Sequence, residues 1–478
     1  MKRIYFFSNG GVARVSPADW DVSETQRAAQ TRGKAFPHLI LIFLTLSYGL
    51  LFSQDKAVNE NDLFSDTSSI TPSSEIVNNA VSKEKVEKST SLSGIIQNAF
   101  IGAANRDWFN NLHRSNMQLT NFIVGNLMLD IRLPQGAKAF ANLETQYTPI
   151  NSGVLVGLRE MFVDGNIKKK VYLRMGKQVL QWGRCTLWNP TDLINVEKKL
   201  FIQKIGYREG AYGIKMHIPF GTSYNVYGFL DTKNASSVDS LAFAGKFEFL
   251  LGGTEMAFSA WDKKFQNSVF GYDISSKVAG IDIAGELAVS EGSNTFSFEK
   301  SGQTLSRVKS DDWQTKACID IGHDFNFFSI PRAFTLTGSF YYNSAGYDDN
   351  LFADNTIYQF KDAISTISPT GTPILKTQGL ARDFLTGLNL YEQHNFSKYY
   401  AALFSSINRL FFSSLSASCN LVDNIPQNSL ILSGGLNYAS LNEFFIGFLV
   451  SGYIGAKNTE YTFQNQAMSV QITAGVTF

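Results

Sequence analysis

The densest group of polar side chains that could act together lies in the segment from Leu158 to Asn195. Guanidinium, amide, indole and carboxylate groups recur there at short intervals. Groups of these types can order small solutes by charge and by hydrogen bonding. They can also pair with one another and hold a connection in place, and both interpretations stay open. The candidate residues are Arg159, Arg174, Gln178, Trp182, Arg184, Asn189 and Asp192.

The end of this segment has the pattern of a helix start. Asn189 can cap a short helix, Pro190 suits the first helical position, and the Asp192 carboxylate can accept hydrogen bonds from free amide groups in the first turn. A strand that ends at Trp182 and Gly183 would lead into this capped connection. We expect the connection to fold across the mouth of the structure that the strands form.

No enzymatic motif accompanies these residues. The sequence contains no HExxH, GxSxG, P-loop or GxGxxG arrangement. The acidic run Asp348-Asp349-Asn350, with Asp354, could bind calcium weakly, but a solvated loop explains it more simply. We therefore expect no catalytic residue, no cofactor and no metal site. The histidines beyond residue 53 also lack i, i+4 pairs: they are His113, His217, His323 and His394.

The cysteines point to no redox or zinc chemistry. Cys185, Cys318 and Cys419 are the three in the chain, they lie more than 90 residues apart, and none is in a CxxC spacing. Neither a zinc knuckle nor a disulfide framework is indicated. We predict that they are ordinary strand or loop residues.

Composition favours many strands and tight turns. Of the 478 residues, 17% are charged and 13% aromatic, with 39 Phe, 38 Gly and only 11 Pro. The net charge of +1 excludes the basic stripe of a nucleic-acid binder. The apolar content is too high for a wholly disordered chain. The residue composition is uniform from about residue 96 onward, which favours one large domain over several.

The N-terminal part of the chain reads as a leader followed by a linker. Residues 39–52 form a 14-residue apolar run after a basic flank, which is typical of a secretory signal. The run is short for a membrane span, which needs about 20 residues, although an uncleaved anchor stays an alternative. We assign 1–53 to a leader with a signal peptide, 54–94 to a disordered polar linker, and 95–478 to the folded domain.

The rest of the chain alternates with period two, as half-buried strands do. Between residues 137 and 147, small and apolar residues fall on one side, and Lys138, Phe140, Asn142 and Glu144 fall on the other. Lys177 breaks the rule, since it shares a side with apolar neighbours. Either it snorkels near an interface or a bulge shifts the register.

The spacing of these strands predicts a transmembrane antiparallel β-barrel of about 18 strands, with 16 as the alternative. Short connections, such as the one at Gly252-Gly253, alternate with long ones that cover about 182–208, 291–312 and 345–395. All the long connections fall at one end, as in outer-membrane barrels. The last strand stops at the aromatic Phe478, which resembles the signal that directs assembly of such barrels. A barrel of this size leaves an aqueous lumen.

The dense segment also resembles a known family. Gly176-Lys177-Gln178, Trp182-Gly183 and Asn189-Pro190-Thr191-Asp192 are similar to the G-(R/K)-Q-x-x-x-W-G and N-P-x-D pattern of porin-like bacterial outer-membrane barrels, which include the alginate-export-like group. The segment 338–343 resembles that family's G-E-Y-Y-Y-N, with Ser339 in place of the acidic residue. The resemblance covers most of residues 96–478 and implies an outer-membrane barrel, without a substrate.

We therefore expect a passive, weakly charge-selective channel for small solutes in the outer membrane of a Gram-negative-type envelope. Its expected partners are outer-membrane lipid, the barrel-assembly machinery and small solutes, and it would be a monomer or a trimer. Alternatives are a surface-display or adhesin barrel that uses the 345–395 loop, and a polymer exporter with a periplasmic partner. Weak selectivity follows from six basic and six acidic lumen candidates: Arg132, Lys138, Arg174, Lys215, Lys246, Lys316, Asp130, Glu144, Glu248, Asp282, Glu286 and Asp320.

Overall fold

The computed structural model describes ten stretches of the chain. The predicted leader, and the predicted linker up to residue 88, lie outside them. Strand β1 begins at Ser89, so the last six residues that we assigned to the linker belong to the first strand. No helix in the described stretches is long and apolar enough to cross a bilayer. The stretches are 89–107, 116–133, 136–148, 153–180, 182–194, 210–233, 235–327, 330–367, 373–439 and 443–478.

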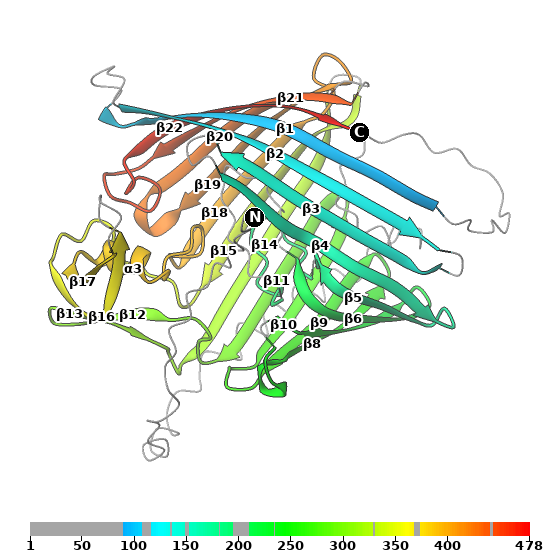
Figure 1. Ribbon diagram of the computed structural model, residues 1–478, viewed down its shortest axis with the longest axis horizontal. Coiled ribbons are helices and arrows are strands. Elements are labelled where there is room, and N and C mark those ends of the chain that lie inside the picture. Colours follow the sequence, from blue (N-terminus) through cyan, green and yellow to red (C-terminus); the bar gives the residue numbers. More distant parts are fainter. Residues whose placement is uncertain are drawn as a thin grey trace, which may run out of the picture. The chain divides into compact units, whose positions relative to one another are not determined.

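Eighteen strands form one closed antiparallel barrel, as the sequence predicted (Figure 1). Each strand pairs with the next barrel strand in the chain, and β22 pairs back with β1 to close the circle. The strands are β1 (Ser89–Asn105), β2 (Met117–Arg132), β3 (Lys138–Thr148), β4 (Gly153–Ile167), β5 (Val171–Gln178), β6 (Ala211–Phe220), β7 (Tyr224–Asp231), β8 (Ala242–Leu251), β9 (Thr254–Lys263), β10 (Val269–Val278), β11 (Ile281–Glu291), β14 (Trp313–Phe327), β15 (Ile330–Asn343), β18 (Tyr399–Ile407), β19 (Leu415–Asn424), β20 (Ser429–Ala439), β21 (Phe444–Ile454) and β22 (Gln466–Thr477).

The connections differ at the two ends of the barrel. The end that holds the start of β1 and the C-terminus also holds the short turns, such as the ones between β8 and β9 and between β10 and β11. The other end holds the connections from β5 to β6, from β11 to β14 and from β15 to β18, which are the three long ones expected. β4 continues through Gly165 and Asn166, so the short turn to β5 falls at residues 168–170.

Two of the long connections carry a second, four-stranded sheet. It contains β12 (Ser297–Ser301), β13 (Thr304–Val308), β16 (Tyr358–Ile367) and β17 (Pro373–Gly379), and the helix α3 (Ala381–Gly387) follows it. Its core is fully apolar and includes Phe352, Phe384 and Leu385, each 0% exposed. The predicted 345–395 loop therefore contains folded structure.

The two faces of the barrel strands have opposite chemistry. Side chains of one parity are large, apolar and exposed, for example Ile96 at 53%, Phe258 at 51% and Ile472 at 44%. The opposite parity carries most of the polar and charged residues; for example, the register pairs Arg132 with Lys138 and Arg174 with Lys215 on this face. All twelve charged lumen candidates fall on this inner face.

The C-terminal residue completes the closure of the barrel. The backbone N–H of Phe478 donates to the Gly94 carbonyl at 3.0 Å, and the Gly94 N–H donates to the Phe478 carbonyl at 2.9 Å. A Cβ at position 94 would lie 2.5 Å from Cζ of the Phe478 ring, so glycine is needed there. The ring itself is 52% exposed on the apolar outer face.

Candidate lumen site

The connection after β5 turns into the barrel. Its described residues, 179–180 and 182–194, include Leu180, Trp182 and Thr191, which are at most 5% exposed. Leu180 and Trp182 pack in one apolar cluster with Phe229 on β7 and Ala244 on β8, both on the inner face. This segment, which we call the inner loop (residues 179–194), therefore lies against the inside of the barrel wall.

Arg184 is the centre of a charge network that fixes the inner loop to that wall. Its guanidinium forms ion pairs with Glu248 on β8 at 2.8 Å, with Glu255 on β9 and with Asp273 on β10. The ammonium of Lys246 also contacts Asp273, at 3.0 Å. The Arg184 side chain is 14% exposed, and Asp273 is 1% exposed. Arg184 thus holds the inner loop in place through carboxylates of the barrel wall, and not through the other candidate residues of the segment as the second interpretation expected.

Two further wall carboxylates hold the loop backbone. Glu286 on β11 accepts hydrogen bonds from the N–H groups of Arg184 (2.5 Å), Cys185 (2.7 Å) and Thr191 (3.1 Å). Asp320 on β14 accepts one from the N–H of Thr186 at 2.6 Å. Buried carboxylates are stable only when they are hydrogen-bonded or paired, and here the amide donors supply those bonds.

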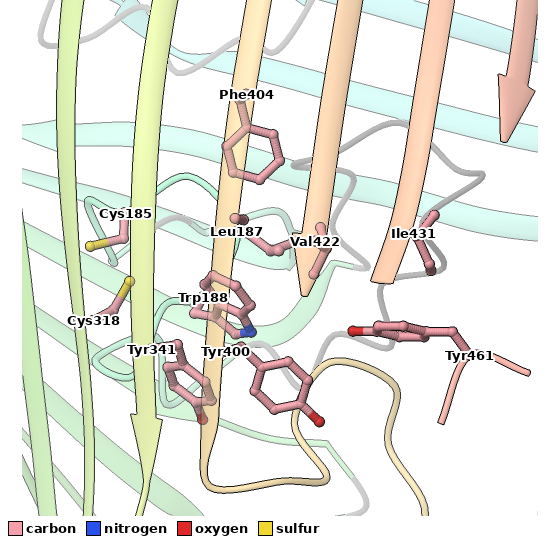
Figure 2. Close-up of a cluster of buried hydrophobic side chains, with 11 residues drawn as sticks. Cys185, Leu187, Trp188, Cys318, Tyr341, Tyr400, Phe404, Val422, Ile431 and Tyr461 are labelled. Carbon is pink, nitrogen blue, oxygen red and sulfur yellow. The ribbon is translucent and has the colours of Figure 1, made fainter. Parts of the chain in front are cut away.

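The far end of the inner loop is anchored by aromatic packing (Figure 2). The Trp188 ring stacks on Tyr341 of β15, with centroids 5.3 Å apart and an angle of 3° between the planes. It also contacts Tyr400 of β18 at 5.9 Å. Its Nε1–H donates to the His394 carbonyl at 2.7 Å. The loop thus contacts both the β7–β11 wall and the β14–β20 wall.

The predicted capped helix is wrong. Residues 189–194 contain a single turn, in which the Asp192 N–H donates to the Asn189 carbonyl at 3.1 Å. The hydroxyl of Thr191 donates to Glu286 at 2.8 Å, so the backbone and side chain of this turn bond to the barrel wall. The Glu286 carboxylate on the barrel wall accepts hydrogen bonds from this turn, so its donors are satisfied without a helix.

The candidate residues on β4 and β5 have separate positions. Arg174 faces the lumen, pairs with Asp164 through two hydrogen bonds of 2.6 and 2.9 Å, and lies 4.0 Å from the centre of the Phe162 ring. Gln178 is 0% exposed and donates to the Arg174 and Gly213 carbonyls, so no solute can reach it. Arg159 lies at a register shift in β4.

Lys177 lies on β5, beside that register shift in β4. Lys177 keeps the outward parity, since it pairs with Met161 and Tyr212, which are both exposed. Its ammonium donates to the Leu158 carbonyl at 2.5 Å and lies 5.0 Å from the centre of the Tyr212 ring. The register of β5 does not shift at Lys177, because the bulge lies in the neighbouring strand β4, and the snorkelling alternative stays a prediction.

The inner loop leaves one side of the lumen accessible to solvent. On β7–β11 the inner loop covers inward-facing residues near mid-strand, with Phe229, Ala257 and Glu286 at 0% exposed, whereas Glu255, Lys277 and Asp282 nearer the strand ends stay 37%, 44% and 52% exposed. On β2–β6 the inward-facing charged side chains stay partly exposed, for example Asp130 and Lys138, each at 19%. This side carries four basic and four acidic residues, which are Arg132, Lys138, Arg174, Lys215, Asp130, Glu144, Glu160 and Asp164.

The sequence tally of lumen charges was incomplete. The register adds acidic residues to the inner face, among them Glu255 and Asp273, the direct partners of Arg184. Their alternation with small residues on β9 and β10 was the signal that could have found them. The additional inward-facing charged residues are Glu160, Asp164, Asp231, Glu255, Asp273, Asp324, Lys263 and Lys277.

A buried carboxylate joins the connections near Trp188. Glu460, between β21 and β22, is 1% exposed and accepts hydrogen bonds from the His394 N–H (3.0 Å), the Tyr400 hydroxyl (2.9 Å) and the Asn424 amide (2.5 Å). Burial raises the pKa of Glu460 to about 7, although these hydrogen bonds act to lower it. His394 is the residue whose carbonyl accepts from Trp188, so Glu460 supports the anchor of the inner loop.

Gly183 allows the close approach that the inner loop needs. A Cβ at this position would lie 2.5 Å from Oδ1 of Asn189 and 2.6 Å from its Cβ. Gly183→Ala should therefore lower the free energy of unfolding by about 1–3 kcal/mol, as overpacking does. Urea titration of the folded barrel, followed by tryptophan fluorescence, measures this change.

Two variants make that test specific. Gly338→Ala is the matched control, because a Cβ there would have no atom within 4 Å. Asn189→Gly combined with Gly183→Ala should recover most of the loss, since it removes the Oδ1, Cγ and Cβ atoms of Asn189 that clash. Equal stability of Gly183→Ala and wild type would contradict the packing described.

Comparisons with known proteins give a likeness of fold. No protein family and no curated protein matches the chain. Among solved structures, the chain is similar to Pseudomonas aeruginosa OccK8 (OprE), at 8% identity and a TM-score of 0.49, and to OccK5 (OpdH), at 9% and 0.47. It is also similar to Pseudomonas aeruginosa OpdL, at 10% and 0.49. Each likeness covers 81% of this chain and 98% of the other. The resemblance to the alginate-export-like group stays a prediction.

Proposed function

We propose that this chain is a passive outer-membrane channel for small solutes, with weak charge selectivity. The observation that carries the proposal is the partly exposed set of charged side chains on the inner face of β2–β6, in a barrel whose outer face is apolar. Charged side chains in contact with solvent inside a barrel of this size indicate a water-filled path.

The outer face supports a location in a membrane. Exposed leucine, isoleucine, valine and phenylalanine side chains recur on the outward parity around the whole barrel, for example Leu127, Phe247 and Leu436. A soluble protein rarely exposes so much contiguous apolar surface. The barrel strands have 8 to 17 residues, and a tilted strand needs about 9–11 to cross a bilayer. Strands can cross only as a closed barrel, which this chain forms.

Weak selectivity follows from the accessible side of the lumen. It carries four basic and four acidic residues, and the Asp130 and Asp164 carboxylates pair with Lys138 and Arg174. The acidic excess on the covered side is partly compensated, because the two cations Arg184 and Lys246 pair with three carboxylates there, those of Glu248, Glu255 and Asp273. Neither sign of charge then dominates the path of a solute.

The inner loop sets the width of that path. It occupies the β7–β20 side of the lumen, and Arg174 faces the space that remains. We therefore propose Arg174 as the constriction residue. Arg184 affects the width of the path indirectly, because it holds the inner loop against the barrel wall. The partners we propose are outer-membrane lipid and the barrel-assembly machinery, which would read Phe478, with the chain as a monomer or a trimer.

A liposome swelling assay tests this function. Vesicles that contain the folded protein should swell in neutral monosaccharides, and more slowly in larger oligosaccharides, because a fixed loop narrows the lumen. A display barrel or a gated polymer exporter would give no swelling. Vesicles with heat-denatured protein are the control. Absence of swelling in vesicles whose barrel is folded would overturn the proposal.

A further inference from the structure

Cys185 and Cys318 lie together inside the barrel, although the sequence indicated unrelated thiols. Cys185 is on the inner loop, and Cys318 is on the inner face of β14 (Figure 2). Their two sulfur atoms and a carboxylate oxygen of Asp320 all lie within 4.8 Å of one another. The two cysteines are 133 positions apart in the sequence, so their spacing gives no sign of this contact.

The backbone on both sides of Cys185 is fixed, so the contact is a built feature of the loop. The N–H of Cys185 donates to Glu286 at 2.7 Å, and the next N–H, of Thr186, donates to Asp320 at 2.6 Å. Three residues further on, Trp188 is stacked on Tyr341, which pairs directly with Cys318 across β14 and β15. These contacts hold the Cys185 side chain over the Cys318 side chain.

The surroundings suit a neutral bond between the sulfur atoms. Cys185 is 3% exposed and Cys318 is 2% exposed, in an apolar cluster with Leu187, Trp188 and Tyr341. A divalent metal ion held by two thiolates and Asp320 would leave a net charge of −1 beside Glu286 in a buried site. A disulfide carries no charge and matches the apolar packing.

We propose that Cys185 and Cys318 form a disulfide that fastens the inner loop to the barrel wall. The proposal rests on the function proposed above, because an outer-membrane protein passes through an oxidising compartment. A thiolate of the pair attacks the disulfide of a protein oxidant and forms a mixed disulfide. The second thiolate then attacks that bond, which forms the Cys185–Cys318 bond and releases the oxidant as a dithiol. Two electrons pass to the oxidant, and the two protons lost by the cysteine thiols end, by way of water, on the dithiol that leaves.

The timing of the bond follows from the burial of the loop. The hydrogen bond with Cys318 and burial both raise the pKa of Cys185, which leaves little thiolate in the folded barrel. The bond should therefore form during assembly, before the inner loop is packed. Once formed, it lies out of reach of reductants, and it limits movement of the loop in the lumen.

A thiol count on the full chain tests the proposal. Protein purified from cell envelopes is denatured with iodoacetamide present, without reductant, and its mass is measured. One alkylated cysteine of three is expected, at Cys419, and all three after reduction. Cys419→Ser should give none before reduction, whereas Cys185→Ser and Cys318→Ser should each give two.

Three alkylated cysteines in wild-type protein before reduction would overturn the proposal. The same result together with bound zinc, measured by elemental analysis, would overturn it in favour of a metal site. The count uses denatured protein and does not depend on conductance. A folded barrel that gives no swelling but has one free thiol would refute the channel and leave the disulfide. A barrel that gives swelling but has three free thiols would refute the disulfide and leave the channel.

Discussion

Arg184→Gln should release the inner loop and convert a weakly selective pore into a cation-selective one. The substitution removes the single guanidinium that pairs with Glu248, Glu255 and Asp273, and leaves three carboxylates on the lumen wall with only Lys246 beside them. Breaking a buried ion pair from one side costs about 3–5 kcal/mol, because the remaining charges lose their compensation. We expect a decrease of this size in the free energy of unfolding, and a higher ratio of potassium to chloride permeability.

The matched control is Arg307→Gln. Arg307 also pairs with a carboxylate, Asp362, but it lies on β13 of the small sheet, and both side chains are largely accessible, at 46% and 34%. Exposed pairs contribute about 0–1 kcal/mol, so this variant should resemble wild type in stability and in selectivity. If Arg184→Gln kept wild-type stability and reversal potential, the inner loop would be held by something other than the Arg184 network.

Glu460→Gln should remove a pH dependence of stability that wild type shows between about pH 4.5 and pH 7. The pKa of Glu460 is raised by burial from 4.5 to about 7, so the folded protein binds this proton more tightly than the unfolded chain does. The resulting stabilisation is complete below the unfolded value and is lost as the pH rises through the folded one. The loss amounts to about 3 kcal/mol, since each pKa unit corresponds to about 1.4 kcal/mol.

Urea titrations at pH 4.5 and pH 8 measure this effect. The difference between wild type and Glu460→Gln isolates Glu460, because His394 and the other titratable groups are common to both proteins. Glu299→Gln, an exposed substitution on β12, is the matched control. A pH slope of Glu460→Gln equal to that of wild type would show that this carboxylate does not titrate as its burial requires.

The barrel could be predicted from the sequence because its physics is local and periodic. Alternation places one side chain in two on each face, and the sorting of residues 137–147 into outward and inward sets was correct. The number of strands followed from the length of the segments. The contrast between short and long connections predicted which end of the barrel carries the long ones. Each of these signals lies within about ten residues of chain.

The interior of the lumen could not be predicted in the same way. The amide donors of Cys185 and Thr191 find Glu286, about a hundred residues away, so a turn replaced the expected helix. The contact of Cys185 with Cys318 is equally non-local. Arg184 was predicted as a candidate residue. Its partners could not be predicted, because they depend on which strands of the folded barrel the inner loop contacts.

Single-channel conductance of the full chain in planar bilayers tests the central claim most directly, after heat-modifiable gel mobility has shown that the barrel is folded. We expect stable conductance steps without an applied ligand, and a reversal potential near zero in a potassium chloride gradient, because basic and acidic residues balance on the accessible side of the lumen. A folded barrel that gives no steps would contradict the open lumen. Steps with strong selectivity for one ion would contradict the balanced wall.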